Sequence, residues 1–245
     1  ALLFETKKFK IEFKIGYRYF VILSCLIGLS LFLGSALQQI ALLYTDVANA
    51  AFFTIFYVPM VPVILFIFKR NSLHWSVWPS VILCLIGGYL LTSFYDATVR
   101  LGDTLVILGA LFWSTHIIFT GMIIAKYNLP ITIGAVQTLI VAIFSFLIGS
   151  VYEEFIFENI VNEIDSILYA GILSGALAFV LQIYAQKNIT PAPAAIIFSL
   201  EGVFATVAAW FLLNQILDIN NLLGCLFILS GVLFSQLVPL IKRTS

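Results

Sequence analysis

Long apolar stretches alternate with short polar connections along nearly the whole chain. A helix needs about 20 predominantly apolar residues to cross a bilayer. Eight stretches reach or approach that length, at residues 19–43, 47–68, 75–94, 104–125, 131–151, 167–185, 192–213 and 222–241. This pattern predicts eight membrane-spanning helices, with the longest internal loop at residues 152–166.

Two prolines distinguish the second stretch from the others. Pro79, Pro130, Pro191 and Pro193 lie near the start of a stretch, where the missing N–H costs nothing. Pro59 and Pro62 lie inside the second stretch, where a proline removes a helical hydrogen bond. We therefore expect the second span to be kinked, or to have carbonyl groups without a helical partner.

The composition excludes most soluble classes of protein. Of 245 residues, 62% are hydrophobic and 10% are charged, against about 25% charged residues in an ordinary soluble domain. The mean hydropathy is +1.11. So few charges cannot cover a soluble surface without leaving large apolar patches. We exclude a soluble enzyme, a nucleic-acid binder and a disordered protein, and expect an all-α polytopic membrane protein.

Basic residues are distributed unevenly over the connections. One alternate set holds Lys7, Lys8, Lys10, Lys14, Arg18, Lys69, Arg70, Lys126, Lys187, Lys242 and Arg243, whereas the other set holds only Arg100. Cytoplasmic loops carry an excess of Lys and Arg, which places the first set and the C-terminus in the cytoplasm. The opposite set carries Asp46, Asp96, Asp103, Glu153, Glu154, Glu158, Glu163, Asp165 and Asp218. The expected location is the cytoplasmic (inner) membrane of a cell.

The chain also contains an internal repeat. An offset of 144 residues aligns residues 29–87 with 173–231 without a gap, and pairs Gln38 with Gln182 and Gly87 with Gly231. The offset maps the first three stretches onto the last three, which leaves the fourth and fifth without partners. We expect a ten-helix fold of two five-helix halves, of which eight helices are present and the first two precede residue 1. The halves are residues 1–98 and 99–245.

An odd number of helices per half means that the halves have opposite orientations in the membrane. Inverted repeats of this kind are common in secondary transporters, where the substrate site lies near the midplane between the repeats. Two similar halves can exchange conformations, which gives outward-open and inward-open states of similar energy. We expect transport to occur by this alternation.

Four stretches of sequence resemble one transporter family. These are QIYAQKNITPAPAAIIFSLE at 182–201, LGALFW at 108–113, YTDVANAAFFT at 44–54 and YVPMVP at 57–62. They are similar to EamA-type transporters of the drug/metabolite transporter superfamily. The resemblance implies ten helices in two repeats, cytoplasmic termini and export of small metabolites. The family often has Glu-Pro where this chain has Glu201-Gly202, which makes a kink there uncertain, and Gly-Glu where it has Asn214-Gln215.

Glu201 is the first candidate for a functional residue. It lies about midway along the seventh stretch, where a charged side chain costs about 2.5–3.5 kcal/mol on insertion scales. Such a residue should face a cavity or be protonated. We consider two roles, contact with a substrate amine or proton coupling, and the alternative of a structural hydrogen bond between helices.

His116 and Trp113 lie three residues apart in the fourth stretch, so that they share a helical face. A histidine within the membrane can titrate near neutral pH and transfer protons. His116 is therefore a second candidate for proton coupling, and Trp113 is a candidate wall of the cavity. The alternatives are a neutral imidazole bonded to Thr115 or Thr120, and a tryptophan that serves packing.

Other polar residues are candidates for lining the cavity. Gln38 and Gln182 are repeat partners, and both amides are expected to line the cavity from opposite halves; the alternative is interhelical hydrogen bonding. Asn49, Thr54 and Tyr57 lie around the expected kink of the second span. Tyr57 aligns with Glu201 under the repeat offset, which places the two at similar depth.

Several residues are assigned structural roles. Cys25, Cys84 and Cys225 lie in apolar runs and are interpreted as small buried hydrophobes rather than disulfides or metal ligands. Gly171 and Gly175 form a GxxxG pair, which predicts close helix packing within the chain. No GxSxG, HExxH or phosphate-loop motif is found. We expect no enzyme activity, no catalytic residues, no metal and no cofactor.

These observations favour a secondary transporter that exports small organic metabolites such as amino acids. Alternatives are a multidrug exporter or a solute importer of the same fold, and a membrane scaffold or receptor that transports nothing. The expected partners are a small-molecule solute, the lipid bilayer and protons as the candidate coupling ion. No nucleic acid is expected, and the chain is predicted to be a monomer or a weak dimer.

Overall fold

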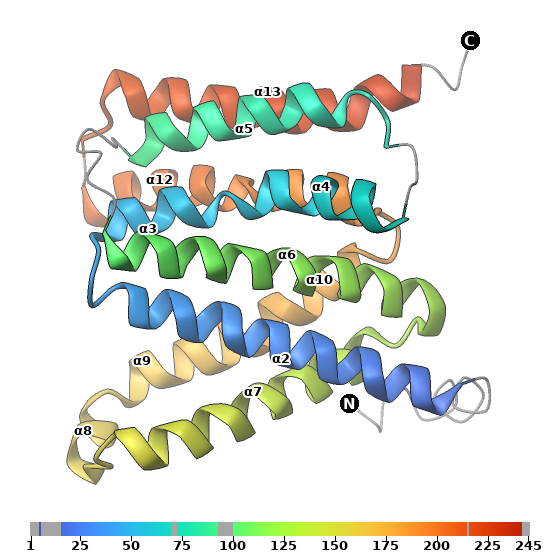
Figure 1. Cartoon of the computed structure of the whole chain (residues 1–245). Helices are drawn as coiled ribbons and strands as arrows, with labels where there is room; N and C mark the ends of the chain where they lie inside the picture. Colours follow the sequence, from blue (N-terminus) through green and yellow to red (C-terminus); the bar gives the residue numbers. More distant parts are fainter. Residues whose placement is uncertain (1–4, 6–15, 70–72, 93–99, 215, 242–245) are drawn as a thin grey trace. The chain divides into compact units, whose positions relative to one another are not determined.

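The computed structural model describes residues 5, 16–69, 73–92, 100–214 and 216–241, and all regular structure in these ranges is helical (Figure 1). The charged residues of the orientation prediction that lie outside these ranges are Lys7, Lys8, Lys10, Lys14, Arg70, Asp96, Lys242 and Arg243. The helices are α2 (Tyr17–Ala41), α3 (Val47–Thr54), α4 (Tyr57–Lys69), α5 (Val77–Thr92), α6 (Leu101–Tyr127), α7 (Pro130–Tyr152), α8 (Phe157–Asn162), α9 (Ile164–Leu168), the π-helix η2 (Tyr169–Ala178), α10 (Phe179–Ala185), α11 (Pro191–Phe198), α12 (Leu200–Leu213) and α13 (Ile219–Ile241).

Within the described residues, seven helices or helical runs are long and apolar enough to cross a membrane. They are Tyr17–Ala41, Asn49–Phe68, Leu101–Tyr127, Pro130–Tyr152, Ile164–Ala185, Pro191–Leu212 and Ile219–Ile241. The remaining predicted stretch corresponds to α5, which is apolar but only 16 residues long. Each apolar stretch of the sequence therefore falls on helix, and the prediction of an all-helical polytopic membrane protein is confirmed.

The prediction of a loop over residues 152–166 is wrong in part. The segment contains the short helix α8 and the start of α9. Glu158 lies in the first turn of α8, where an acidic side chain interacts favourably with the helix dipole. With six residues, α8 is too short to be detected by a search for membrane-length apolar runs.

The helices form two compact units that are described separately. One comprises Ala1–Leu33 with Phe119–Ile189, and the other comprises Gly34–Ile118 with Thr190–Ser245. Each unit contains residues from both predicted repeats. Helices α2 and α6 each run from one unit into the other. These units are defined by contacts between residues, whereas the predicted repeats, residues 1–98 and 99–245, are defined by sequence. The units therefore do not test the predicted repeats.

The first unit is built around an apolar core from α2, α6, α7 and α10. Its buried members are Phe20, Leu23, Ile27, Ile123, Ile124, Tyr127, Leu129, Ile133 and Ile183. Tyr127 also donates a hydrogen bond of 2.9 Å to the carbonyl oxygen of Gly16. The carboxylate of Glu5 accepts bonds from the backbone N–H groups of Ile131 and Thr132 at the start of α7. These contacts join sequence-distant parts of the unit.

The sixth predicted span is the least packed helical run. It consists of α9, η2 and α10, and η2 is a ten-residue π-helix without buried residues. A Cβ atom added to Gly171 would meet nothing within 4 Å, and one added to Gly175 would meet only the Ala170 carbonyl of the same run. The prediction that this GxxxG pair packs closely is therefore wrong within the described residues. Cys25 is likewise exposed, whereas Cys84 is buried as predicted and Cys225 is intermediate.

In the second unit, two spans are broken near their middle. The second span divides into α3 and α4, as its prolines predicted. Pro59 has no N–H to bond the carbonyl of Ile55, and that carbonyl instead accepts the N–H of Val58 at 2.9 Å. The seventh span divides into α11 and α12 at Ser199, whose hydroxyl donates to the Ile196 carbonyl at 2.6 Å. The break is present although no proline directly follows Glu201.

The two broken spans have matching boundaries. Helix α3 begins at Val47 and ends at Thr54, and α11 begins at Pro191 and ends at Phe198. Both helices have eight residues. Their bounds differ by the 144 residues of the sequence repeat, so the repeat aligns not only the apolar stretches but also the positions of the two breaks.

Helices α5 and α13 lie side by side and pack through glycines (Figure 1). A Cβ added to Gly87 would lie 2.7 Å from the Gly224 carbonyl oxygen and 2.6 Å from Cγ1 of Ile228. One added to Gly231 would lie 2.9 Å from the Ser80 carbonyl oxygen and 3.0 Å from Sγ of Cys84. Residue numbers rise along one helix as they fall along the other, so the two helices are antiparallel.

Packing of the broken spans is unequal. Helix α11 packs against α4 and α5, whereas the equivalent pairs, α3 with α12 and α3 with α13, are not among the packed helix pairs of the described residues. Side-chain burial agrees with this difference. Ala195 of α11 is completely buried, but its repeat partner Ala51 on α3 is exposed. One of two equivalent pairings is therefore among the packed helix pairs of the described residues and the other is not.

Candidate functional site at the broken spans

Tyr57 and Glu201 meet at the two breaks. Tyr57 is the first residue of α4, and Glu201 lies in the first turn of α12. The Tyr57 hydroxyl donates to Oε1 of Glu201 over 3.5 Å, which is at the long limit for a hydrogen bond. Their sequence separation is 144, the repeat offset. The breaks thus bring two repeat-equivalent side chains into contact, and the predicted similar depth of these residues has a direct structural counterpart.

The two partners of this contact have different surroundings. Tyr57 is buried, with 4% of its surface exposed, whereas Glu201 is exposed. Ser114 of α6 packs behind Tyr57, and its hydroxyl lies 3.4 Å from the Tyr57 carbonyl oxygen. The Tyr57 backbone is therefore in contact with α6, while its phenol hydroxyl donates to the Glu201 carboxylate. Such a pair can accept a proton or the ammonium group of a solute.

A second contact connects this region with helix α5. The Ser199 hydroxyl, at the break before Glu201, lies 3.4 Å from Sγ of Cys84. Both residues are buried. The Ser199 side chain at the break in the seventh span therefore contacts α5. Ser114 and Ser199 were not among the predicted site residues because serines that bond backbone carbonyls have no distinctive sequence pattern.

Trp113 and His116 share one face of α6, as predicted. Their ring centroids are 6.1 Å apart with an interplanar angle of 85°. The His116 side chain is completely buried. The indole of Trp113 packs over Gly34 of α2, where an added Cβ would lie 3.3 Å from Nε1. The histidine thus lies in a packed region rather than on a surface, which leaves both the proton-transfer role and the structural role as interpretations.

Asn49 and Thr54 lie on α3. The Asn49 side chain is 9% exposed. The Thr54 hydroxyl donates to the carbonyl of Ala50 at 2.7 Å, one turn earlier in the same helix. This bond occupies the Thr54 donor and leaves its oxygen only as an acceptor. The predicted cavity role is therefore restricted, for Thr54, to accepting a hydrogen bond.

Gln38 and Gln182 belong to different units. Gln38 lies on α2 within the second unit, close to Gly109 of α6, and Gln182 lies on α10 within the first unit. Both side chains are partly buried. Their predicted convergence on one cavity stays a prediction. Among the described residues, no group of three or more His, Cys, Asp or Glu side chains is placed to hold a metal ion.

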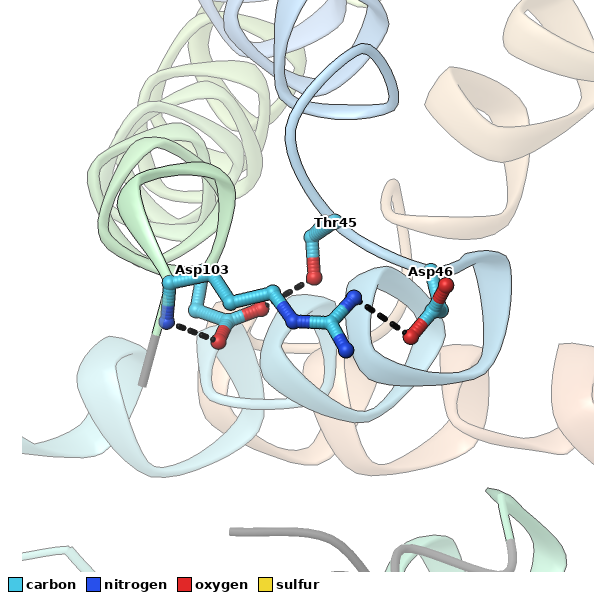
Figure 2. Close-up of polar contacts among 4 residues, drawn as sticks. Thr45, Asp46 and Asp103 are labelled. Atoms are coloured by element: carbon cyan, nitrogen blue, oxygen red, sulfur yellow. Dashed lines mark hydrogen bonds and ion pairs between the residues drawn. The ribbon is translucent and has the colours of Figure 1, made fainter. Parts of the chain in front are cut away.

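A polar cluster lies at the start of α6. From the sequence, its charged members Asp46, Arg100 and Asp103 indicated only the side of the membrane. Thr45 donates to Oδ1 of Asp103, and the Arg100 backbone N–H donates to Oδ2 of Asp103 at 2.8 Å (Figure 2). Nη1 of Arg100 lies 2.7 Å from Oδ2 of Asp46. Asp103 is three residues beyond Arg100, which is the spacing at which an acidic side chain bonds back to the N-cap N–H. That spacing is the signal that sequence reasoning missed.

A family profile and two curated proteins that are similar to the chain describe transporters. Residues 100–237 match the profile of the EamA-like transporter family. Two proteins of Archaeoglobus fulgidus, each described as an uncharacterized transporter, are similar to the chain. One is 28% identical over 92% of this chain and 70% of its own length, and the other is 25% identical over 80% and 69%.

A solved crystal structure has the same fold. It matches with a TM-score of 0.73 at 16% sequence identity, over 91% of this chain and 79% of its own. At that identity the likeness concerns the fold alone. The family profile covers more than half of the chain, and the helices have the length and composition of membrane spans. The chain is therefore a multi-pass membrane protein that belongs to the EamA-like transporter family.

Proposed function

We propose that the protein is a secondary transporter that exports small polar or zwitterionic metabolites such as amino acids, by alternating access around the Tyr57–Glu201 contact. The observation that carries the proposal is this contact between repeat-equivalent residues at two helix breaks. In transporters, substrate and ion sites are typically built where spans are broken near the midplane. An intramembrane carboxylate that served no purpose would cost about 2.5–3.5 kcal/mol.

An inverted repeat within a ten-helix fold is part of the proposal. Its support is the exchange of contacts between α5 and α13. The Gly87–Ile228 and Gly231–Cys84 contacts are interchanged by the 144-residue offset. Two copies that exchange contacts in this way are related by a two-fold axis, and antiparallel partners place the axis perpendicular to the helices. In a membrane such an axis lies in the plane of the bilayer, and we infer that Tyr57 and Glu201 lie close to it.

The same offset supports residues 1–98 and 99–245 as the two repeats, with two helices of the first repeat preceding residue 1. The charge distribution supports a cytoplasmic C-terminus in the inner membrane. With this orientation, the packed α4–α11 pair lies toward the cytoplasm and the open α3–α12 pair lies toward the outside. From this arrangement we infer an outward-open state.

The proposed roles follow from this arrangement. The Glu201 carboxylate binds the solute's ammonium group or a coupling proton, and Tyr57 donates to the carboxylate. Asn49, Thr54, Gln38, Gln182 and Trp113 line the pathway, and His116 is a second candidate for proton transfer. No catalytic step and no cofactor is required, because the energy comes from an ion gradient rather than from a reaction.

The test is a flux assay with the full-length chain in proteoliposomes. A pH gradient is imposed, and transport of a radiolabelled amino-acid mixture is followed. The gradient-driven flux of the Glu201→Gln variant should be lower than that of the parent by a factor of about ten or more, because an amide can neither bind a proton nor carry the negative charge of the carboxylate. Glu158→Gln, in the exposed helix α8, is the matched control and should retain parental flux. Parental flux in Glu201→Gln would remove the carboxylate from the mechanism, and no flux by the parent would contradict the amino-acid substrate.

A further inference from the structure

We propose that Thr45, Asp46, Arg100 and Asp103 form an outer latch, which holds the start of α3 against α6 and thereby stabilises the state in which α3 is apart from α12. The inference rests on the proposed function for its two states and its orientation. It concerns residues outside the Tyr57–Glu201 site. Its basis is the contact geometry of the four residues and the unequal packing of the two broken spans.

The core of the latch is a buried carboxylate with partners from two segments. Asp103 is completely buried, and Thr45 is 8% exposed. Oδ1 of Asp103 accepts from the Thr45 hydroxyl in the connection between α2 and α3, and Oδ2 accepts from the Arg100 N–H at the start of α6 (Figure 2). A buried carboxylate that loses a donor retains the full cost of its desolvation. The Thr45–Asp103 bond therefore resists separation of the two segments.

A second contact lies on the solvent side of the first. Nη1 of Arg100 and Oδ2 of Asp46 are 2.7 Å apart, with side-chain exposures of 43% and 67%. Asp46 is the residue directly before α3. Because exposed ion pairs contribute little, this pair should be the weaker half of the latch. It nevertheless connects the same two segments.

Close backbone packing completes the attachment. A Cβ added to Gly102 would lie 2.6 Å from the Ala41 carbonyl oxygen and 2.8 Å from the Thr45 backbone nitrogen. The first turn of α6 is therefore pressed against the connection between α2 and α3. Beyond it, Ala50 and Phe53 of α3 share an apolar cluster with Val106 of α6. The outer end of α3 is thus attached to α6 by a polar cluster, a glycine contact and an apolar cluster in succession.

The latch lies at the end of α3 that would have to pack against α12 in the alternate state. In the alternate state of an inverted repeat, the packed α4–α11 pair is exchanged for the α3–α12 pair. Helix α3 would then pack on α12 as α11 now packs on α4. The latch holds the end of α3 that must move, so closure of the outer side requires α3 to separate from α6 and the latch to rupture. Loss of the latch should shift the population toward the closed state.

The experiment measures the α3–α12 distance by double electron–electron resonance. Spin labels are attached to Val47→Cys and Phe211→Cys, at exposed positions near the outer ends of the two helices. The full-length chain is used, with Cys25, Cys84 and Cys225 replaced by serine. Asp103→Asn should increase the fraction with the shorter distance about tenfold, which is the effect of losing one hydrogen bond to a charged group. Arg100→Gln should produce a smaller shift in the same direction.

Asp218→Asn is the matched control. Asp218 is also predicted to lie on the outer side, and its carboxylate accepts from the N–H of Asn221 at 2.8 Å within its own helix start. It should leave the distance distribution unchanged. If Asp103→Asn does not fold, Arg100→Gln decides. A parental distribution in the folded latch variants, or an equal shift in Asp218→Asn, would overturn the latch. If flux depends on Glu201 but the distances in the latch variants are not shifted, the latch alone is refuted. If the distances are shifted but no flux depends on Glu201, only the transport proposal is refuted.

Discussion

The α5–α13 pair and the two broken spans differ in how they use the same repeat. Between α5 and α13, each glycine contact occurs twice, with the roles of the helices exchanged. Between the broken spans, one of two equivalent packings is formed, α4 with α11, and the other is not among the packed pairs of the described residues. Exchange of the conformations of the two repeats converts the α5–α13 contact into itself, so this contact is the same in both states. On the proposed mechanism, α5–α13 is the constant part of the unit and the broken spans are the part that alternates.

The largest effect is expected where the constant part is packed most closely. In Gly87→Leu, even the first added carbon would lie 2.7 Å from the Gly224 carbonyl oxygen. Because this neighbour is backbone, α5 and α13 must separate, and we expect a cost of more than about 3 kcal/mol and little folded protein. The measurement is the yield and melting temperature of detergent-purified protein. Gly171→Leu, at a position with nothing within 4 Å, is the control; equal loss in both variants would contradict a special role for the α5–α13 contact.

An intermediate effect is expected for a pair of substitutions at equivalent positions of the alternating part. Ala195→Leu overfills a completely buried site on α11, and we expect a loss of about 1–3 kcal/mol. Ala51→Leu introduces the same side chain at an exposed site on α3 and should change stability by less than about 0.5 kcal/mol. Thermal unfolding of both variants measures the difference. Equal destabilisation would mean that the two broken spans are packed alike in solution.

The smallest effect is expected at the site itself. Tyr57→Phe removes a hydroxyl that reaches Glu201 only over 3.5 Å. A bond of that length should contribute less than about 1 kcal/mol to stability. The variant should therefore fold as the parent does, while its flux in proteoliposomes falls because the carboxylate loses a donor. A large loss of stability would instead identify the contact as structural.

Much of the fold follows from the apolar pattern of the sequence. Within the described residues, each of the eight apolar stretches falls mainly on helix, and Pro59 marks the break in the second span because it cannot donate to Ile55. The break at Ser199 could not be derived in this way, since no proline follows Glu201 and the bond that terminates α11 is made by a serine hydroxyl. Close packing was assigned to Gly171 and Gly175, but it occurs at Gly87, Gly224 and Gly231. Spacing of glycines cannot specify which helix faces them.

The candidate site was predicted in part. Repeat alignment paired Tyr57 with Glu201, and the contact between them is present. The latch was not predicted, because Asp46, Arg100 and Asp103 were used only to orient the chain in the membrane. Their mutual contacts depend on the distance between the α2–α3 connection and the start of α6, which lie more than 50 residues apart in sequence. Charge counting gives the side of the membrane but not the partner of each charge.

The inversion of the two repeats is the central claim, and labelling single cysteines from each side of the membrane tests it most directly. Cysteines are placed at Lys69, Lys187, Asp46 and Asp218 of the full-length chain and exposed to an impermeant maleimide in oriented vesicles. The account predicts that positions 69 and 187 react only from the cytoplasmic side, and that positions 46 and 218 react only from the outside. Reaction of positions 69 and 218 from the same side would place the ends of α4 and α12 on one face and contradict the inverted repeat.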